Sequence, residues 1–444
     1  MDARYEVDAL TIERKTTMPS PAADVPAGLI FCLALALRLA WVIFVQVHQP
    51  GDANYIQGDA DEYTAVARNL LEGKAWWSSD LGGSPYFDGP LFPLFVAVFL
   101  ALNLSLFWVT VALALIGAAT CWGVVRLGRR LTNPAGAVAA GLVMAVYPYF
   151  FHYTGQILTE TLSVLFGLLS FATLIFFSRD PSPRNAAAAG LTLGLATLNH
   201  PESYLAPPLL LAWALLFHPQ RALVARRLFI AFVVMGLAIL PWHAYHAVKN
   251  GKNILLPPAL NASGILVQGT LAAKGRITRD PAYGKQVHVL NSEGHALEQQ
   301  RGTLGAVWVA AGRVLGDAGK DPRGYLWLVA MKFRRMWGLA PEWGTYARWW
   351  ITIPTGLLNV AVYLGCVGGL ILTRRRDEAW LALAIVAMAT LPHLVFYAQP
   401  RYRLPAMPIV ILFAGAAFGA ACDRLAARHR PAGDLLTKDQ GRWG

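Results

Sequence analysis

The chain is built from long apolar blocks that are separated by short polar connections. Of its 444 residues, 56% are hydrophobic and only 14% are charged. A bilayer core of about 30 Å accepts helices of about 20 such residues, whereas a soluble domain would expose them as large apolar patches. The sequence therefore predicts an all-α polytopic membrane protein with about ten or eleven transmembrane helices. The apolar blocks cover residues 27–48, 91–101, 107–125, 135–151, 162–177, 186–198, 204–217, 228–245, 351–373, 379–397 and 404–422.

Basic residues gather at the ends of these blocks, and the formal net charge is +12. This placement is the pattern that the positive-inside rule gives for cytoplasmic connections. No basic module with base-stacking aromatic residues accompanies them, so we expect no nucleic-acid partner. The clusters comprise Arg126, Arg129 and Arg130; Arg179 and Arg184; Arg221, Arg226 and Arg227; Arg374, Arg375 and Arg376; and residues 424–430.

Two polar stretches interrupt the apolar pattern and define the predicted organisation. Because neither has the arginine clustering of the other connections, both are predicted on the periplasmic face of an inner membrane, with both termini in the cytoplasm. The predicted segments are a cytoplasmic tail at 1–26, a transmembrane catalytic module at 27–247 with a first periplasmic loop at 49–89, a periplasmic or interfacial segment at 248–350, C-terminal transmembrane helices at 351–422, and a cytoplasmic tail at 423–444.

The short block at 91–101 leaves one point of the topology open. If it and the block at 107–125 both cross the membrane, Arg126, Arg129 and Arg130 lie outside, against the positive-inside rule. The alternative is that the short block is a partial or kinked span.

The first loop carries three carboxylates within four residues, Asp59, Asp61 and Glu62. Apolar side chains recur at helical spacing from Tyr63 to Leu71, which predicts a short amphipathic helix at the membrane surface. Asp59 or Asp61 would cap its start, and Gly73 would end it. A carboxylate beside lipid has a raised basicity, which suits proton abstraction from an acceptor hydroxyl.

Five segments form an ordered pattern along most of the chain. They are Asp59 with Tyr63, Ala67, Asn69, Leu70 and Gly73, followed by Pro90–Leu94; Tyr153 with Thr159–Leu162; Leu198–Glu202; Leu240–Trp242 with Lys249–Gly251; and Arg401–Pro405 with Pro408. This pattern resembles the C-type (GT-C) membrane glycosyltransferase superfamily. It is most similar to the bacterial relatives of protein O-mannosyltransferases and of the lipid A aminoarabinose transferase, which are glycosyltransferase family 39-like. The sequence departs from the pattern at Ala60, Asp88, His200 and Tyr245–His246.

The resemblance implies a GT-C fold and an inverting hexosyl- or pentosyltransferase. Such an enzyme moves a sugar from a polyprenyl-phosphate donor to a hydroxyl of a glycan, lipid or protein acceptor. Asp59 matches the first-loop aspartate and is predicted as the general base. Lys249, Arg401 and Arg403 are predicted to hold the donor phosphate, because a guanidinium pairs with phosphate through two hydrogen bonds. If residues 401–403 are extended, the side chain of Tyr402 points away from those of Arg401 and Arg403 and packs against the rest of the protein.

Further polar residues near the ends of the blocks are predicted to contact the substrates. Glu160 begins an apolar block, where a carboxylate is costly unless it is paired, although a Thr159–Glu160 helix cap is an alternative. Arg38, inside the first block, is expected to snorkel or to pair internally. The predicted substrate-binding set is Asp61, Glu62, Tyr63, Asp88, His152, Tyr153, Glu160, His200, Glu202 and His246.

The sequence gives no metal-ligand spacing among its His, Cys, Asp and Glu residues. We therefore predict no obligatory cofactor and leave a divalent cation open. Two other functions also stay open: a flippase or transporter of lipid-linked sugars, and a non-catalytic assembly subunit. A transporter would commonly show repeated halves and charges at mid-bilayer, whereas the acids here lie in a loop.

Overall fold

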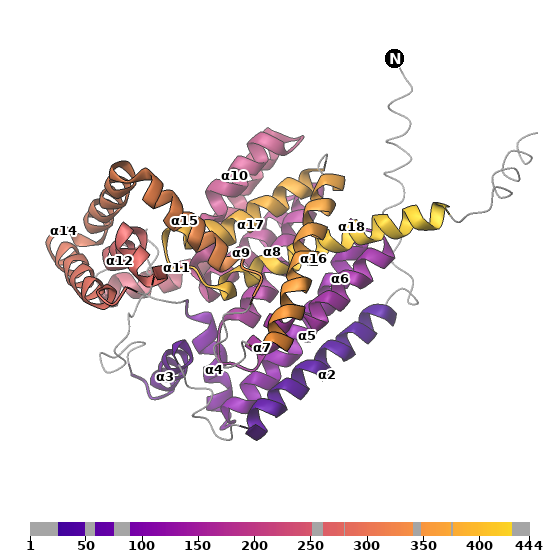
Figure 1. Ribbon diagram of the computed structural model, residues 1–444, viewed down its shortest axis with the longest axis horizontal. Coiled ribbons are helices and arrows are strands. Elements are labelled where there is room, and N and C mark those ends of the chain that lie inside the picture. Colours follow the sequence, from indigo (N-terminus) through magenta and orange to yellow (C-terminus); the bar gives the residue numbers. More distant parts are fainter. Residues whose placement is uncertain are drawn as a thin grey trace, which may run out of the picture.

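The structure of the protein is a computed structural model, and it describes residues 25–48, 58–74, 89–250, 261–278, 280–340, 348–373 and 376–428, with the side chains of 249 and 250 excepted. Over these residues the chain is all-helical, as predicted (Figure 1). The helices are α2 (Val25–His48), α3 (Asp59–Leu71), α4 (Leu91–Ala101), α5 (Leu106–Leu131), α6 (Pro134–Val146), α7 (Pro148–Thr154), α8 (Glu160–Arg179), α9 (Pro183–Asn199), α10 (Ala206–Phe217), α11 (Arg221–Asn250), α12 (Ala262–Gly269), α13 (Lys274–Thr278), α14 (Tyr283–Lys320), α15 (Pro322–Met336), α16 (Trp349–Thr373), α17 (Asp377–Val395) and α18 (Met407–Arg428), with 3₁₀ helices η5 (Pro201–Leu205), η6 (Leu271–Ala273) and η8 (Pro400–Ala406).

Seven helices in the described part of the chain are long and apolar enough to cross a membrane, or eight if the bent pair α6 and α7 is one span. This is fewer than the ten or eleven that we predicted from apolar blocks. The difference lies in α4, α9 and α10, whose 11, 17 and 12 residues fall short of a full span. Apolar composition identified these helices, but it did not determine their lengths.

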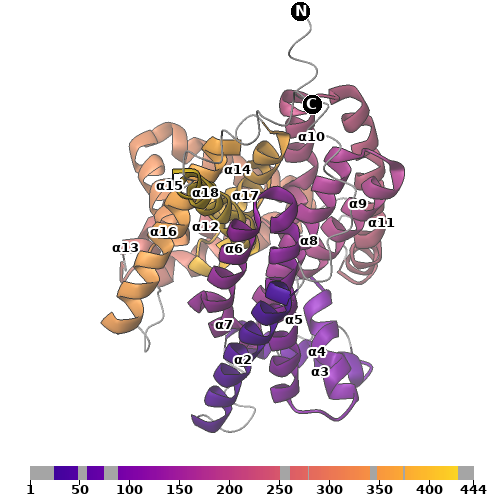
Figure 2. The same ribbon diagram turned by 90° about the vertical axis from the view of Figure 1, so that its right-hand side faces the viewer.

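The length of helix α4 favours the second alternative for the topology, a partial span. At 1.5 Å per residue, its 11 residues extend about 16 Å, roughly half of a bilayer core. It packs with α3 and the first half of α5 in a common apolar cluster that includes Tyr63, Phe92 and Leu106 (Figure 2). Helix α4 is too short to cross the bundle. Helix α5, with 26 residues, is long enough to cross it and carries Arg129 and Arg130 to the opposite end.

The two ends of the bundle differ in their chemistry. Helix α8 begins at Glu160 and ends at Arg179, a length of about 30 Å over its 20 residues. At the far end, Arg179 donates to Glu378 at 2.8 Å and to the carbonyl oxygen of Arg130 at 3.4 Å. The basic connections therefore gather at the end that carries α10, whereas α3 lies at the other end (Figure 1).

A proline break in the bundle explains the buried arginine of the first span. Helices α6 and α7 meet at a bend of 48°, and Pro148 lacks the N–H that would bond the carbonyl of Met144. Arg38, only 1% exposed, donates to the carbonyl oxygens of Met144 at 3.4 Å and Ala145 at 3.5 Å. Of the two expectations for Arg38, internal pairing is therefore correct and snorkelling is wrong.

A smaller helical unit of α12 and α14 lies beside the bundle (Figure 1). It has its own apolar cluster, which Phe396 from the end of α17 joins. Lys332 of α15 secures the attachment, because its ammonium group donates to the carbonyl oxygens of Gln268 at 2.5 Å and Val395 at 2.8 Å. The unit is thus held at the same end of α17 as His393.

Candidate functional site

The first-loop helix α3 presents its carboxylates at its start. It begins after Gly58, which has a φ of 61°, and its first turn contains Asp59, Asp61 and Glu62. No side chain caps this helix, so the predicted cap by Asp59 or Asp61 is wrong; both lie inside the first turn, where the helix dipole favours negative charge. Gly73, with a φ of 67°, ends the helix as predicted.

Three predicted residues from distant parts of the chain meet at one ion cluster. The guanidinium of Arg401 in η8 donates from Nη2 to Oδ2 of Asp59 in α3. Its Nη1 also lies 3.3 Å from Oε1 of Glu160, at the first position of α8. The side chains of Arg401 and Glu160 are 14% and 7% exposed, whereas that of Asp59 is 40% exposed. The cluster is therefore buried on the Glu160 side and open on the Asp59 side.

Glu160 takes the position of a paired carboxylate and not of a helix-capping pair. Thr159 precedes it at the N-cap, but its side chain makes no capping hydrogen bond. Burial of an unpaired carboxylate would be costly, and Arg401 provides the compensating charge. The ion pair explains how an acid is tolerated at the start of an apolar helix.

Arg403 has different partners from Arg401, and a role of both in holding the donor phosphate stays a prediction. Segment Pro400–Ala406 is a 3₁₀ helix with three residues per turn, so residues two apart point in different directions. Arg403 is completely buried and donates to the carbonyl oxygens of Met336 at 2.9 Å and Gly338 at 2.6 Å. Its guanidinium also lies 4.8 Å from the ring centroid of Tyr149. These contacts of Arg403 tie η8 to the end of α15, while its buried Nε and Nη2 have no hydrogen-bond acceptor among the described residues.

A second polar group adjoins the cluster. Oε1 of Glu202 in η5 lies 2.9 Å from Nε2 of His393 in α17 and 3.4 Å from Nδ1 of His200. The ring of His393 stacks on that of Tyr402, with centroids 4.2 Å apart and an interplanar angle of 5°. Tyr402 in turn accepts a hydrogen bond at its hydroxyl from Arg401, at 3.2 Å. Tyr402 is therefore packed, as predicted, but it does not face away from Arg401, because the segment is a 3₁₀ helix and not extended. It joins the two polar groups.

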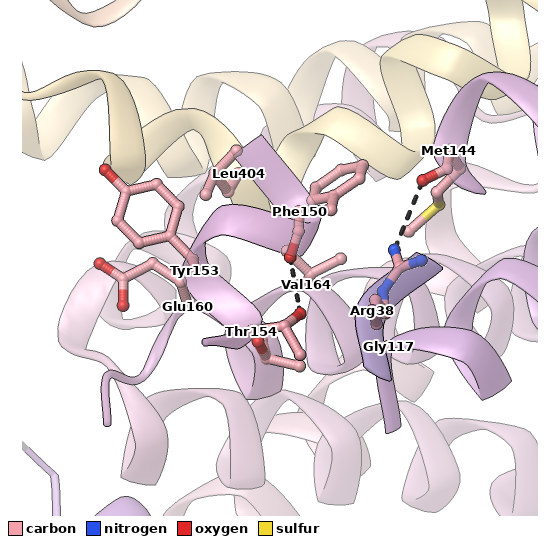
Figure 3. A pocket seen from close by; sticks show the side chains of 10 residues that line it. Arg38, Gly117, Met144, Phe150, Tyr153, Thr154, Glu160, Val164 and Leu404 are labelled. Carbon is pink, nitrogen blue, oxygen red and sulfur yellow. Dashed lines mark hydrogen bonds between the residues drawn. The ribbon is translucent and has the colours of Figure 1, made fainter. Parts of the chain in front are cut away.

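A cavity extends from the ion cluster into the bundle (Figure 3). Tyr153 and Glu160 line one end, Arg38 and Met144 line the other, and the space between them is only about large enough for one water molecule. Two of the predicted substrate-binding residues, Tyr153 and Glu160, therefore border the same cavity, and Glu160 also contacts Arg401.

The remaining predicted residues are dispersed. Asp61 and Glu62 stand beside Asp59 on α3, and Tyr63 is buried edge-on against Phe92, with ring centroids 5.1 Å apart. Two histidines have other partners. His152 of α7 is hydrogen-bonded to Gln156, which follows that helix, and the ring of His246 packs against that of Trp242 in α11. Asp88 and the side chain of Lys249 lie outside the described residues.

Burial shifts the protonation of two of these groups. Partial burial, and then the negative charges of Asp59 and Asp61, raise the pKa of Glu62 above its usual range. Burial lowers the pKa of His200 to about 4, against a smaller opposing effect of Glu202. His200 is therefore neutral near pH 7 and does not supply positive charge to the site.

The arrangement fits a guanidinium better than a metal ion. Asp59 and Glu160 point at one cation, and that cation is Arg401. Over the described part of the chain, no group of three or more His, Cys, Asp or Glu side chains is placed to hold a metal.

His393 is the residue that the sequence analysis missed. It lies in the last turn of α17, directly after Pro392, and it is 7% exposed. An ionisable residue inside an apolar block is costly and by default functional, and this signal was present in the block at 379–397.

Comparison with known proteins gives a family match and a fold match. Residues 87–246 match the family described as dolichyl-phosphate-mannose-protein mannosyltransferase. The oligosaccharyltransferase of Archaeoglobus fulgidus in its apo form is similar over 89% of this chain, with 14% identity and a TM-score of 0.52. The same archaeal enzyme, AglB, in complex with an inhibitory peptide and a dolichol-phosphate, is similar over 90% of this chain, with 15% identity and a TM-score of 0.51.

This chain covers only about half of the archaeal enzyme, 51% of its length. ArnT from Cupriavidus metallidurans also matches, over 81% of this chain and 71% of its own, with 15% identity and a TM-score of 0.36. No protein with a curated description matches the sequence.

Proposed function

We propose that this chain, which has the fold of the C-type (GT-C) membrane glycosyltransferases, transfers a sugar from a polyprenyl-phosphate donor to an acceptor hydroxyl with inversion at the anomeric carbon. The observation that carries the proposal is the meeting of Asp59, Glu160 and Arg401 at one end of the bundle. The family match covers Glu160 and has a lipid-phosphate sugar donor in its description. The archaeal enzyme of similar fold was solved with a dolichol-phosphate.

Asp59 is the proposed general base. Its side chain is 40% exposed, so an acceptor hydroxyl can approach it, and its ion pair with Arg401 holds the carboxylate at the start of α3. As the acceptor oxygen bonds to the anomeric carbon, its proton passes to Asp59. Because the base and the leaving group lie on opposite faces of the sugar, the donor must enter between Asp59 and Arg401 and replace their ion pair. The bond from the anomeric carbon to the phosphate oxygen then breaks, and the lipid phosphate leaves with the electron pair.

Arg401 is the proposed ligand of the departing phosphate. Its two terminal nitrogens already bond Asp59, Glu160 and the Tyr402 hydroxyl. Its Nε is buried and has no hydrogen-bond acceptor among the described residues, which leaves this donor for a phosphate oxygen. Charge that develops on the leaving phosphate would then be stabilised where it appears.

We place this site at the periplasmic face of the inner membrane. The supporting observation is that Arg130, Arg179 and Arg424 belong to the opposite end of the bundle, where the positive-inside rule expects the cytoplasm. The unit of α12 and α14, within the predicted periplasmic segment 248–350, lies at the same end as the site.

The test is sugar transfer by the purified protein in detergent, with a polyprenyl-phosphate sugar as donor. Asp59→Asn should lower turnover by at least about 100-fold, the range that general-base catalysis supplies, with unchanged expression. Glu72→Gln is the control, because Glu72 follows the other end of the same helix and its side chain, 53% exposed, pairs with Lys74. An Asp59→Asn enzyme that keeps full activity would remove the catalytic assignment.

The same preparation separates the alternative functions. If vesicles that contain the protein move the lipid-linked sugar across the bilayer without release of the sugar, a flippase is the better explanation. If neither release nor movement occurs with any donor of this class, an assembly subunit is favoured.

A further inference from the structure

Hydrogen bonds around His393 fix where its protons must lie. Nδ1 of His393 is 2.9 Å from the carbonyl oxygen of Tyr397, and Nε2 is 2.9 Å from Oε1 of Glu202. A carbonyl oxygen only accepts, so Nδ1 must carry a hydrogen. In a neutral imidazole, Nε2 then has only a lone pair, and it cannot bond an ionised carboxylate.

A proton must therefore lie between Nε2 and Glu202. Either the imidazole is charged and donates to the carboxylate, or the carboxyl group is protonated and donates to a neutral imidazole. In both cases the pair holds one proton more than a neutral histidine beside an ionised glutamate, and its net charge is zero. With exposed fractions of 7% and 6%, both groups would be costly to bury without this proton.

The pair contacts the proposed phosphate ligand through one aromatic ring. His393 stacks on Tyr402 at 4.2 Å, and the Arg401 guanidinium lies 5.1 Å from the centroid of the same ring. Asp59 and Glu160 bring two negative charges against the single positive charge of Arg401. If Glu202 also became negative without a charged imidazole beside it, the site would repel an anionic donor more strongly.

We propose that Glu202 and His393 are positioning residues that share one proton, and that this proton keeps the site receptive to a lipid phosphate. The inference rests on the proposed function for its effect on the donor, but the shared proton rests on geometry alone. Loss of the proton would leave a negative Glu202 facing the lone pair of Nε2. This repulsion would weaken both the stacking of His393 on Tyr402 and the binding of the anionic donor.

Other ionisable groups lie near Glu202 and His393 and also bear on the charge of the site. His200 faces Glu202 from the end of α9, and Glu160 of α8 is a further nearby negative charge. Tyr402 of η8 stacks on His393 and accepts a hydrogen bond from Arg401. Lys332 of α15 bonds the carbonyl of Val395, and the guanidinium groups of two further arginines lie over the Tyr397 ring. These two are Arg276 and Arg335. For none of these neighbours do the described contacts include a hydrogen bond to Nε2 of His393, whereas Oε1 of Glu202 lies 2.9 Å from it.

The proton itself can be tested without any activity. Nitrogen-15 NMR of histidine-labelled protein at pH 7, with His393→Asn to identify the signal, should show Nδ1 protonated and a proton bound or hydrogen-bonded at Nε2. In Glu202→Gln, His393 should be a neutral Nδ1–H imidazole that accepts from the amide. A wild-type Nε2 with no proton and no hydrogen bond would overturn the proposal, whether or not the protein transfers sugar.

The effect on the donor is tested by kinetics between pH 6 and 10. In the wild type, kcat/KM for the polyprenyl-phosphate sugar should fall about tenfold per pH unit above a midpoint, mainly through a higher KM. Glu202→Gln should lack this fall, because an amide has no such proton to lose. Glu378→Gln, which removes a carboxylate paired with Arg179 at the far end, should keep the wild-type profile. A fall that persists in Glu202→Gln, or a flat wild-type profile, would overturn the coupling to donor binding.

Discussion

Asp59 and Arg401 are 342 positions apart in the sequence, and their side chains form an ion pair. One begins the first-loop helix, and the other lies in the 3₁₀ turn before the last span. Had these two regions lain at opposite ends of the bundle, the proposed chemistry would have been impossible. Their contact instead brings the first-loop acid and the late arginine together with Glu160 in one ion cluster.

Substitutions of Arg401 and Glu160 should have non-additive effects on the free energy of unfolding. Arg401→Gln leaves Glu160 buried without a counter-charge, which should lower the free energy of unfolding by about 3 to 5 kcal/mol. In Arg401→Gln/Glu160→Gln, much of that loss should be recovered, because neither charge remains. Thermal unfolding in detergent measures all three variants. Strictly additive effects would show that the two side chains do not interact.

Arg403 should matter for folding and not for the donor. Arg403→Met removes a guanidinium that bonds two backbone carbonyls, which should cost about 2 to 4 kcal/mol of stability. The KM for the polyprenyl-phosphate sugar should stay within about twofold of the wild type in the folded fraction, whereas Arg401→Lys should raise it by about tenfold or more. A large rise of KM in Arg403→Met would restore the phosphate role that the sequence had predicted.

Gly167→Ala should displace the segment that carries Arg401. A Cβ at Gly167 in α8 would lie 2.1 Å from the carbonyl oxygen of Pro405, which is backbone and cannot turn aside. We expect a loss of about 1 to 3 kcal/mol of stability and a lower kcat. Gly236→Ala is the matched control, since it is also helical and nothing lies within 4 Å of the added carbon. Equal stability of the two variants would contradict the close packing of α8 against η8.

Acidification should destabilise the protein through His200. Its pKa is lowered from 6.5 to about 4 by burial, so the unfolded chain takes up a proton at a higher pH than the folded one. The stability from this group is complete above pH 6.5 and is lost as the pH falls towards 4. The loss should reach about 2 to 3 kcal/mol, and it should be absent in His200→Gln. Unfolding midpoints at pH 7 and pH 4.5 decide the point, and an equal acid shift in both proteins would exclude His200 as its source.

From the sequence, the fold class and three members of the candidate site, Asp59, Glu160 and Arg401, were predictable. Long apolar blocks can be buried only as helices in lipid, so an all-helical membrane protein followed directly from composition and order. The short helix that starts at Asp59 and ends at Gly73 followed from helical spacing and from a glycine that tolerates a positive φ. The convergence of first-loop acid and late arginine was anticipated from the GT-C resemblance.

Only the tertiary structure decided which polar side chains share an environment. Whether an apolar helix of 11 residues crosses the bundle depends on what packs around it, and local composition does not record this. Arg401 and Arg403 are equivalent in sequence, yet a 3₁₀ turn sends one to Asp59 and the other to the carbonyls of Met336 and Gly338. The partner of His393 lies 191 positions away in Glu202, so its proton was set by a contact that no local pattern specifies.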